Sequence, residues 1–198
     1  MFNAGFADIY SFFYLTPWIL MFLIPAITMK SLVEEYEQGT IEILKTKSLT
    51  SKDIILGKYL ACSLISIIAI LPTFIYVICI YFLANPIGNI DLGNIIGSYF
   101  GLFFLAFTFT SLGIFASTIS KSQITAFLIA VCIGFFFYYG LEITLETLDL
   151  DNDFFNFLSI QNHFKNIAKG VLDSRDFIYF ISISFAFLFT SKLILDAK

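Results

Sequence analysis

The stretch YLACSLISIIAILPTFIYVICIYFL, residues 59–83, runs for 25 residues without a charged side chain. About 20 apolar residues are enough for a helix to cross the hydrocarbon core of a bilayer. Lipid offers no hydrogen-bond partner to open backbone groups, so the segment must be helical, and it lacks the strict alternation of a barrel strand. The stretch therefore predicts a membrane-spanning helix.

Four further apolar runs of similar length occur, at residues 10–29, 95–118, 123–143 and 177–195. The 198-residue chain is 59% hydrophobic and only 13% charged, whereas a soluble domain usually carries about 25% charged residues. We predict an all-α polytopic transmembrane helix bundle with five spans, built as a single domain over residues 1–198.

The lysines and arginines fall unevenly between the spans, which predicts orientation. One side holds eight of them: Lys30, Lys45, Lys47, Lys52, Lys58, Lys121, Lys192 and Lys198. The other side holds three, all within residues 144–176. Because cytoplasmic segments are enriched in Lys and Arg, we place residues 30–58, the turn at 119–122 and the C-terminus in the cytoplasm.

This orientation puts Met1 outside, although the first nine residues contain no basic residue. No positively charged region precedes the first apolar run, so that run does not resemble a cleaved signal peptide. We therefore expect the natural protein to have one further span before this sequence, six in all.

Several classes of function find no support in the sequence. No basic cluster interleaved with aromatic residues appears, so we expect no nucleic-acid binding. Cys62, Cys79 and Cys132 lie in apolar runs without a C-x-x-C pair, which favours small buried hydrophobes over metal ligands or disulfides. His163 has no second His or Cys outside the membrane, and we expect it to be a surface hydrogen-bonding residue. We predict no cofactor and no metal.

The cytoplasmic segment 30–58 reads KSLVEEYEQGTIEILKTKSLTSKDIILGK. An S-x-x-E at 31–34 and a T-x-x-D at 50–53 are helix-start signatures, in which the hydroxyl caps a free backbone N–H. Gly39 is a plausible helix stop, and Thr40 a plausible start for a short amphipathic helix. Spacing alone does not decide whether this segment is a solvated connector or a helix that docks on another protein.

Two features predict packing outside this segment. Gly97 and Gly101 form a G-x-x-x-G that permits close helix approach, within one subunit or between two. Residues 144–176 carry apolar side chains at helical spacing, so we expect one or two amphipathic helices that lie on the outer leaflet or fold back onto the bundle. Prolines 17, 25 and 72 predict kinks in their spans.

Three motifs follow one another around the cytoplasmic segment: P-x-x-T-M-K-S at 25–31, E-E-x-x-x-G-T-I-E-I-L at 34–44 and L-x-x-x-x-I-I-L-G-K at 49–58. In this order they resemble the membrane subunits of type-2 ABC exporters. The later stretches NPIGNIDLGNIIGSYFG (85–101), GIFASTIS (113–120) and HFKNIAKGVLDSRDFIYF (163–180) bring the resemblance closest to the GldF-type permease subunits of gliding-motility ABC transporters.

The resemblance implies six spans, a cytoplasmic N-terminus, a place in the bacterial inner membrane and a cytoplasmic segment that contacts an ATPase. The residues carried over as the coupling element are Glu34, Glu35, Gly39, Thr40, Glu42 and Lys58. The chain contains no G-x-x-x-x-G-K-[ST], so we expect it to be no enzyme itself.

The implied partners are a separate ABC ATPase subunit and a second permease subunit, in a homodimer or a heterodimer. The implied function is the permease of an ATP-driven exporter. A non-transporting membrane scaffold for a motility or secretion complex is the alternative, because the same docking helix would serve it.

Overall fold

The computed structural model describes residues 2–3, 6–7, 10–41, 50–84, 87–141, 143, 158–170 and 173–197. Within these residues, five helical segments are long and apolar enough to cross a membrane: Tyr10–Glu37, Ser51–Leu83, Leu92–Ile119, Gln123–Gly140 and Ser174–Ala197. The predicted all-α fold and its five spans are confirmed. The strands in the described residues are β1 (Phe2–Asn3) and β2 (Phe6–Ala7), a short antiparallel pair.

The helices follow the predicted order along the chain. The first segment comprises α1 (Tyr10–Thr28) and α2 (Lys30–Glu37), and the second comprises α4 (Ser51–Ile70), a 3-10 turn at Leu71–Thr73 and α5 (Phe74–Leu83). Then come α6 (Leu92–Ile119), α7 (Gln123–Phe135) with a π-helical turn η2 (Phe136–Gly140), α10 (Ile160–Ala168) and α11 (Ser174–Ala197).

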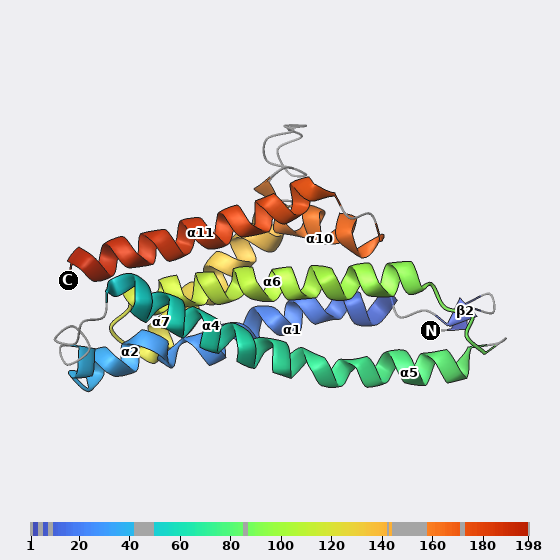
Figure 1. Cartoon of the computed structure of the whole chain (residues 1–198), viewed down its shortest axis with the longest axis horizontal. Helices are drawn as coiled ribbons and strands as arrows, with labels where there is room; N and C mark the ends of the chain where they lie inside the picture. The colour runs from blue at the N-terminus through green and yellow to red at the C-terminus, as the bar shows by residue number, and fades with distance from the viewer. Residues whose placement is uncertain are drawn as a thin grey trace.

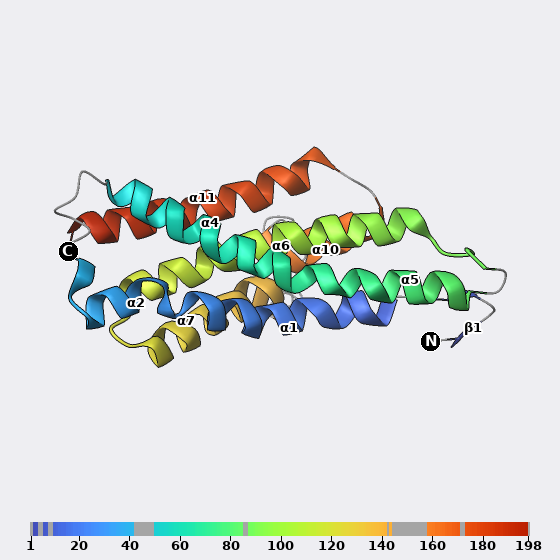
Figure 2. The same cartoon turned by 60° about the horizontal axis from the view of Figure 1, so that its bottom comes forward.

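The central element is α6, which packs against α1, α4, α7, α10 and α11 (Figures 1 and 2). At the crossing of α1 and α6, Gly113 lies directly against the buried side chain of Thr28. A Cβ at Gly113 would overlap the Thr28 hydroxyl, so glycine sets how closely these two helices approach. The outward faces of α4 and α5 stay apolar; Leu60, Leu64 and Phe82 are each more than half exposed, as suits side chains that meet lipid.

The two ends of the bundle are distinct (Figure 1). The second helix α2, the starts of α4 and α7 and the C-terminus gather at one end, while β1, β2, the end of α5 and the start of α6 lie at the other. The described parts of the segments that the lysine count predicts to be cytoplasmic thus lie together in space. Following that predicted orientation, we refer to the first end as the cytoplasmic end and to the second as the outer end.

The prolines affect the helices differently. Pro72 lies in the 3-10 turn that separates α4 from α5, at one of the positions where a kink is predicted. Pro17 and Pro25 lie inside α1, which remains α-helical through both.

The expected helix start at Ser31 is wrong. Met29, the residue before α2, has helical φ and ψ and makes no side-chain cap, so α1 and α2 form an almost continuous helix. The other two signals are confirmed. Thr50 and Asp53 form a complete capping box at the start of α4, and Gly39 ends the α2 region with a φ of +67°, a conformation that glycine adopts without strain.

Candidate functional site

The candidate site is the helix α2, whose inner face is anchored in an apolar cluster. Leu32 and Val33 are fully buried. Leu32 belongs to a cluster with residues from α4, α6 and α11: Ile54, Ile55, Cys62, Ile114 and Leu195. Burial of this face fixes the orientation of α2, so its remaining side chains have defined directions.

The first turn of α2 is held by a hydroxyl from a different helix. Ser117 Oγ, on α6, accepts hydrogen bonds from the backbone N–H of Leu32 at 2.9 Å and of Val33 at 3.3 Å. Ser117 is itself fully buried. It takes the place of the local Ser31 cap that the sequence suggested, because Ser31 lies inside α2 and is not the non-helical residue that precedes its first turn.

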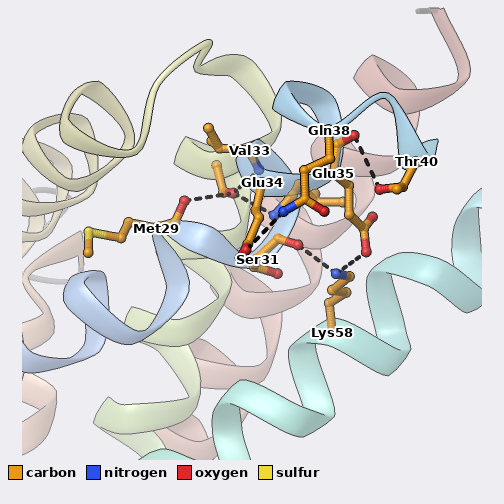
Figure 3. A network of polar contacts seen from close by, with 10 residues as sticks. Met29, Ser31, Val33, Glu34, Glu35, Gln38, Thr40 and Lys58 are labelled. Atoms are coloured by element: carbon orange, nitrogen blue, oxygen red, sulfur yellow. Dashed lines mark hydrogen bonds and ion pairs between the residues drawn. The ribbon is translucent and has the colours of Figure 1, made fainter.

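An ion pair joins α2 to α4 (Figure 3). Lys58 Nζ donates to Glu35 Oε1 and, at 2.6 Å, to the Ser31 carbonyl oxygen. The Lys58 side chain is 29% exposed and the Glu35 side chain 18% exposed. Two of the predicted coupling residues are therefore brought together, and their charged groups face each other inside the protein.

The neighbouring polar residues of α2 point the other way. Glu34, Glu37 and Gln38 are exposed. Gln38 Nε2 donates to Glu34 Oε1 at 3.2 Å, and Gln123 Nε2, at the start of α7, donates to Glu37 Oε2 at 3.4 Å. Glu34 and Glu37, together with Gln38, which directly follows the helix, form what we call the acidic face of α2.

The remaining predicted coupling residues follow α2. Gly39 is exposed, and a Cβ there would meet no atom within 4 Å. Thr40 Oγ1 donates to the Glu35 carbonyl oxygen at 3.4 Å. Glu42, and most of the short helix expected to begin at Thr40, lie outside the described residues.

The glycine pair lies far from α2, in the outer half of α6. A Cβ at Gly97 would overlap the Ile167 carbonyl oxygen, and one at Gly101 would lie 3.0 Å from Phe164 Cδ2. Both neighbours belong to α10, the described part of the outer segment. That helix folds back onto the bundle and buries Ile160, Phe164 and Ile167 against it.

The expectation of a surface-exposed His163 is wrong. His163 is buried; its Nδ1 shares a hydrogen bond with the buried carboxylate of Asp176, and its ring stacks on Tyr179 at 3.9 Å between centroids. Asp176 lies in the first turn of α11, so this contact ties α10 to α11.

The three cysteines are free. Cys62 is buried as expected, but Cys79 and Cys132 are exposed on the surface of the bundle, so the expectation of burial is wrong for these two. Within the described residues no group of three or more His, Cys, Asp or Glu side chains is placed to hold a metal ion.

A sequence profile of the family described as ABC-2 family transporter protein matches residues 3–195. The chain belongs to the ABC-2 transporter family. As an ABC-2 permease it is a multi-pass membrane subunit of an ABC transporter, a class of permease that associates with a separate ABC ATPase. No curated protein matches the chain.

Sequence reasoning missed two residues that organise this ABC-2 permease. Ser117 contacts a helix that lies 84 and 85 residues earlier in the chain, and Asp176 pairs with a histidine 13 residues before it. Neither spacing belongs to the i to i+4 pattern of a single helix, so no local signal marked either residue.

Proposed function

We propose that this ABC-2 permease is the membrane subunit of an exporter of the gliding-motility type in the bacterial inner membrane. We further propose that it works beside a second permease subunit and that α2 is its ATPase coupling helix. The gliding-motility assignment rests on the resemblance of the motifs over residues 25–58, 85–101, 113–120 and 163–180.

The observation that carries the coupling role is the division of acids on α2. Glu34 and Glu37 point outward, whereas Glu35 is turned inward onto Lys58. An exposed acidic surface at the cytoplasmic end suits a basic patch on a soluble subunit, since complementary charge steers association and fixes the register of the contact. Glu35 is better suited to hold α2 in place than to touch the partner.

The contacts of α2 suggest how a push on it would reach the membrane. The helix is nearly continuous with α1, is linked to α4 through Lys58 and is linked to α6 through Ser117. A partner that displaced α2 would therefore act on three membrane-spanning helices at once. Such movement of packed helices as units is one of the usual forms of conformational change.

Charge reversal on the acidic face tests the docking proposal. Glu34→Lys with Glu37→Lys should release the ATPase in co-purification while membrane insertion and thermal unfolding stay unchanged. The control is Asp196→Lys, which alters an exposed acid in the last turn of α11. Full retention of the ATPase by the double variant would refute docking through this face.

The exporter proposal and the non-transporting scaffold alternative predict different results for Lys58→Met. If the permease transmits motion, this variant should bind the ATPase but lower the ATPase rate of the reconstituted complex. An unchanged rate in an intact complex would favour the scaffold.

A further inference from the structure

A cavity of about 310 Å³ lies in the outer half of the bundle, between α1, the start of α6, η2 and α10. Its volume is at the lower end of the range for small-ligand sites, about 300–1,000 Å³. Half of its lining residues are aromatic, among them Tyr14, Trp18, Tyr138 and Phe164. Walls of this kind suit the apolar body of a ligand.

Gln161 places a buried amide oxygen without a described hydrogen-bond partner in the wall of the cavity. It lines the cavity and is only 6% exposed, yet its Oε1 has no hydrogen-bond partner in the described part of the chain. By contrast Ser98, on the opposite wall, already donates to Asn94 Oδ1 at 3.3 Å and to the Ala168 carbonyl oxygen at 3.4 Å. An unpaired buried amide oxygen is costly, and a hydroxyl group on a ligand would satisfy it.

The opening of the cavity is lined by two lysines and two exposed tyrosines. Lys165 on α10 and Lys169, the residue that directly follows α10, both line it and are both exposed. Tyr10 and Tyr14 line it from α1 and are 65% and 54% exposed. Tyrosines at the end of a membrane-spanning helix are typical of the level of the lipid headgroups, so the opening lies where headgroups are.

We propose that this cavity binds the headgroup of an anionic phospholipid that bears a free hydroxyl, of which phosphatidylglycerol is the simplest example. Lys165 and Lys169 hold the phosphate, Gln161 Oε1 accepts a hydrogen bond from the hydroxyl, and the glycerol backbone lies against the aromatic wall. The proposal concerns the outer end of the protein and is independent of the coupling role of α2.

The chain contains a single tryptophan, Trp18, and it lines this cavity. Intrinsic fluorescence therefore reports directly on the site. The purified full chain in detergent micelles is titrated with phosphatidylglycerol or phosphatidylcholine that carries brominated acyl chains, which quench tryptophan on contact. Brominated phosphatidylglycerol should quench Trp18 at about 30-fold lower concentration, since each lysine contributes roughly a fivefold preference for an anionic lipid.

Two sets of variants separate the roles of the residues. Lys165→Gln with Lys169→Gln should bring the preference for phosphatidylglycerol close to one, whereas Lys121→Gln at the cytoplasmic end should leave it intact. Gln161→Met should weaken phosphatidylglycerol binding about fivefold through loss of one hydrogen bond. Because this change also removes an unpaired buried oxygen, the thermal unfolding midpoint without lipid should not fall.

Equal quenching by the two lipids in the wild-type protein would overturn the proposal without recourse to any variant. So would a preference that survives the double lysine substitution. Glycerol 3-phosphate distinguishes the source of the ligand: it should compete only weakly with brominated phosphatidylglycerol. Competition as strong as that of the unbrominated lipid would reject a membrane lipid in favour of a soluble phosphate ester.

Discussion

Replacement of Lys58 by methionine isolates the ion pair that ties α2 to α4. Methionine keeps an unbranched apolar stem of similar length and removes the ammonium group. The Glu35 carboxylate, with its side chain 18% exposed, then loses its cation, and the Ser31 carbonyl oxygen loses its donor. The expected result is loss of stability at the cytoplasmic end with the spans intact.

The degree of burial sets the size of the effect. An exposed ion pair contributes about 0.2–1 kcal/mol, whereas breaking a fully buried pair costs about 3–5 kcal/mol. The side chains of Lys58 and Glu35 are 29% and 18% exposed, which lies between these limits. We expect Lys58→Met to lower the free energy of unfolding by about 1–3 kcal/mol.

The assay is unfolding of the purified protein by sodium dodecyl sulfate in mixed micelles, applied to Lys58→Met, Glu35→Gln and the double variant. Because the two residues are in contact, the losses should not add, and the double variant should be little worse than Lys58→Met. The matched control is Lys192→Met, whose partner Asp196 lies 3.6 Å away in a more exposed pair. A loss for Lys58→Met no greater than for Lys192→Met, or fully additive losses, would refute this reasoning.

Three further substitutions follow from the described contacts. Ser117→Ala leaves two backbone N–H groups of α2 without an acceptor and should cost about 1–2 kcal/mol in the same unfolding assay; a neutral result would mean that another group satisfies them. Gly97→Ala forces a methyl group onto the backbone of α10 and should lower the free energy of unfolding by about 1–3 kcal/mol. The control is Gly57→Ala, which has no atom near its Cβ and should be neutral or stabilise α4 by up to about 1 kcal/mol. Equal effects of the two substitutions would argue against close packing at Gly97. Asp176→Ala removes the partner of buried His163 and should cost about 1–3 kcal/mol, seen also as faster proteolysis between α10 and α11; unchanged proteolysis would indicate that other contacts hold the two helices together.

The fold could be predicted because the apolar runs are long and uninterrupted. The span expected at residues 59–83 is the apolar part of Ser51–Leu83. The part of this helix before the apolar run, Ser51 to Lys58, is mixed in polarity. In the sequence it was marked only by the capping signal of Thr50 and Asp53. Helix existence thus followed from composition, and the true helix start followed from the cap.

The candidate site was only partly predictable. Sequence placed the acids of α2 in the cytoplasm, but it could not tell that Glu35 faces Lys58 while Glu34 faces outward, because that depends on which side of α2 packs on the bundle. The Ser31 signal failed because Ser31 lies inside α2, and N–H groups of the first turn donate to Ser117 on α6 instead. Ser117 and Asp176 act through contacts between separate helices, and such contacts produce no regular spacing of residues in the sequence.

The central claim is that the acidic face of α2 meets the ATPase, and site-specific cross-linking tests it most directly. A photoreactive amino acid at Gln38, exposed on that face, should cross-link to the ATPase subunit in intact membranes. The same probe at Ile87, which is 69% exposed and lies between the end of α5 and the start of α6, should not. Absence of the cross-link at Gln38, or equal cross-linking from both positions, would contradict the account.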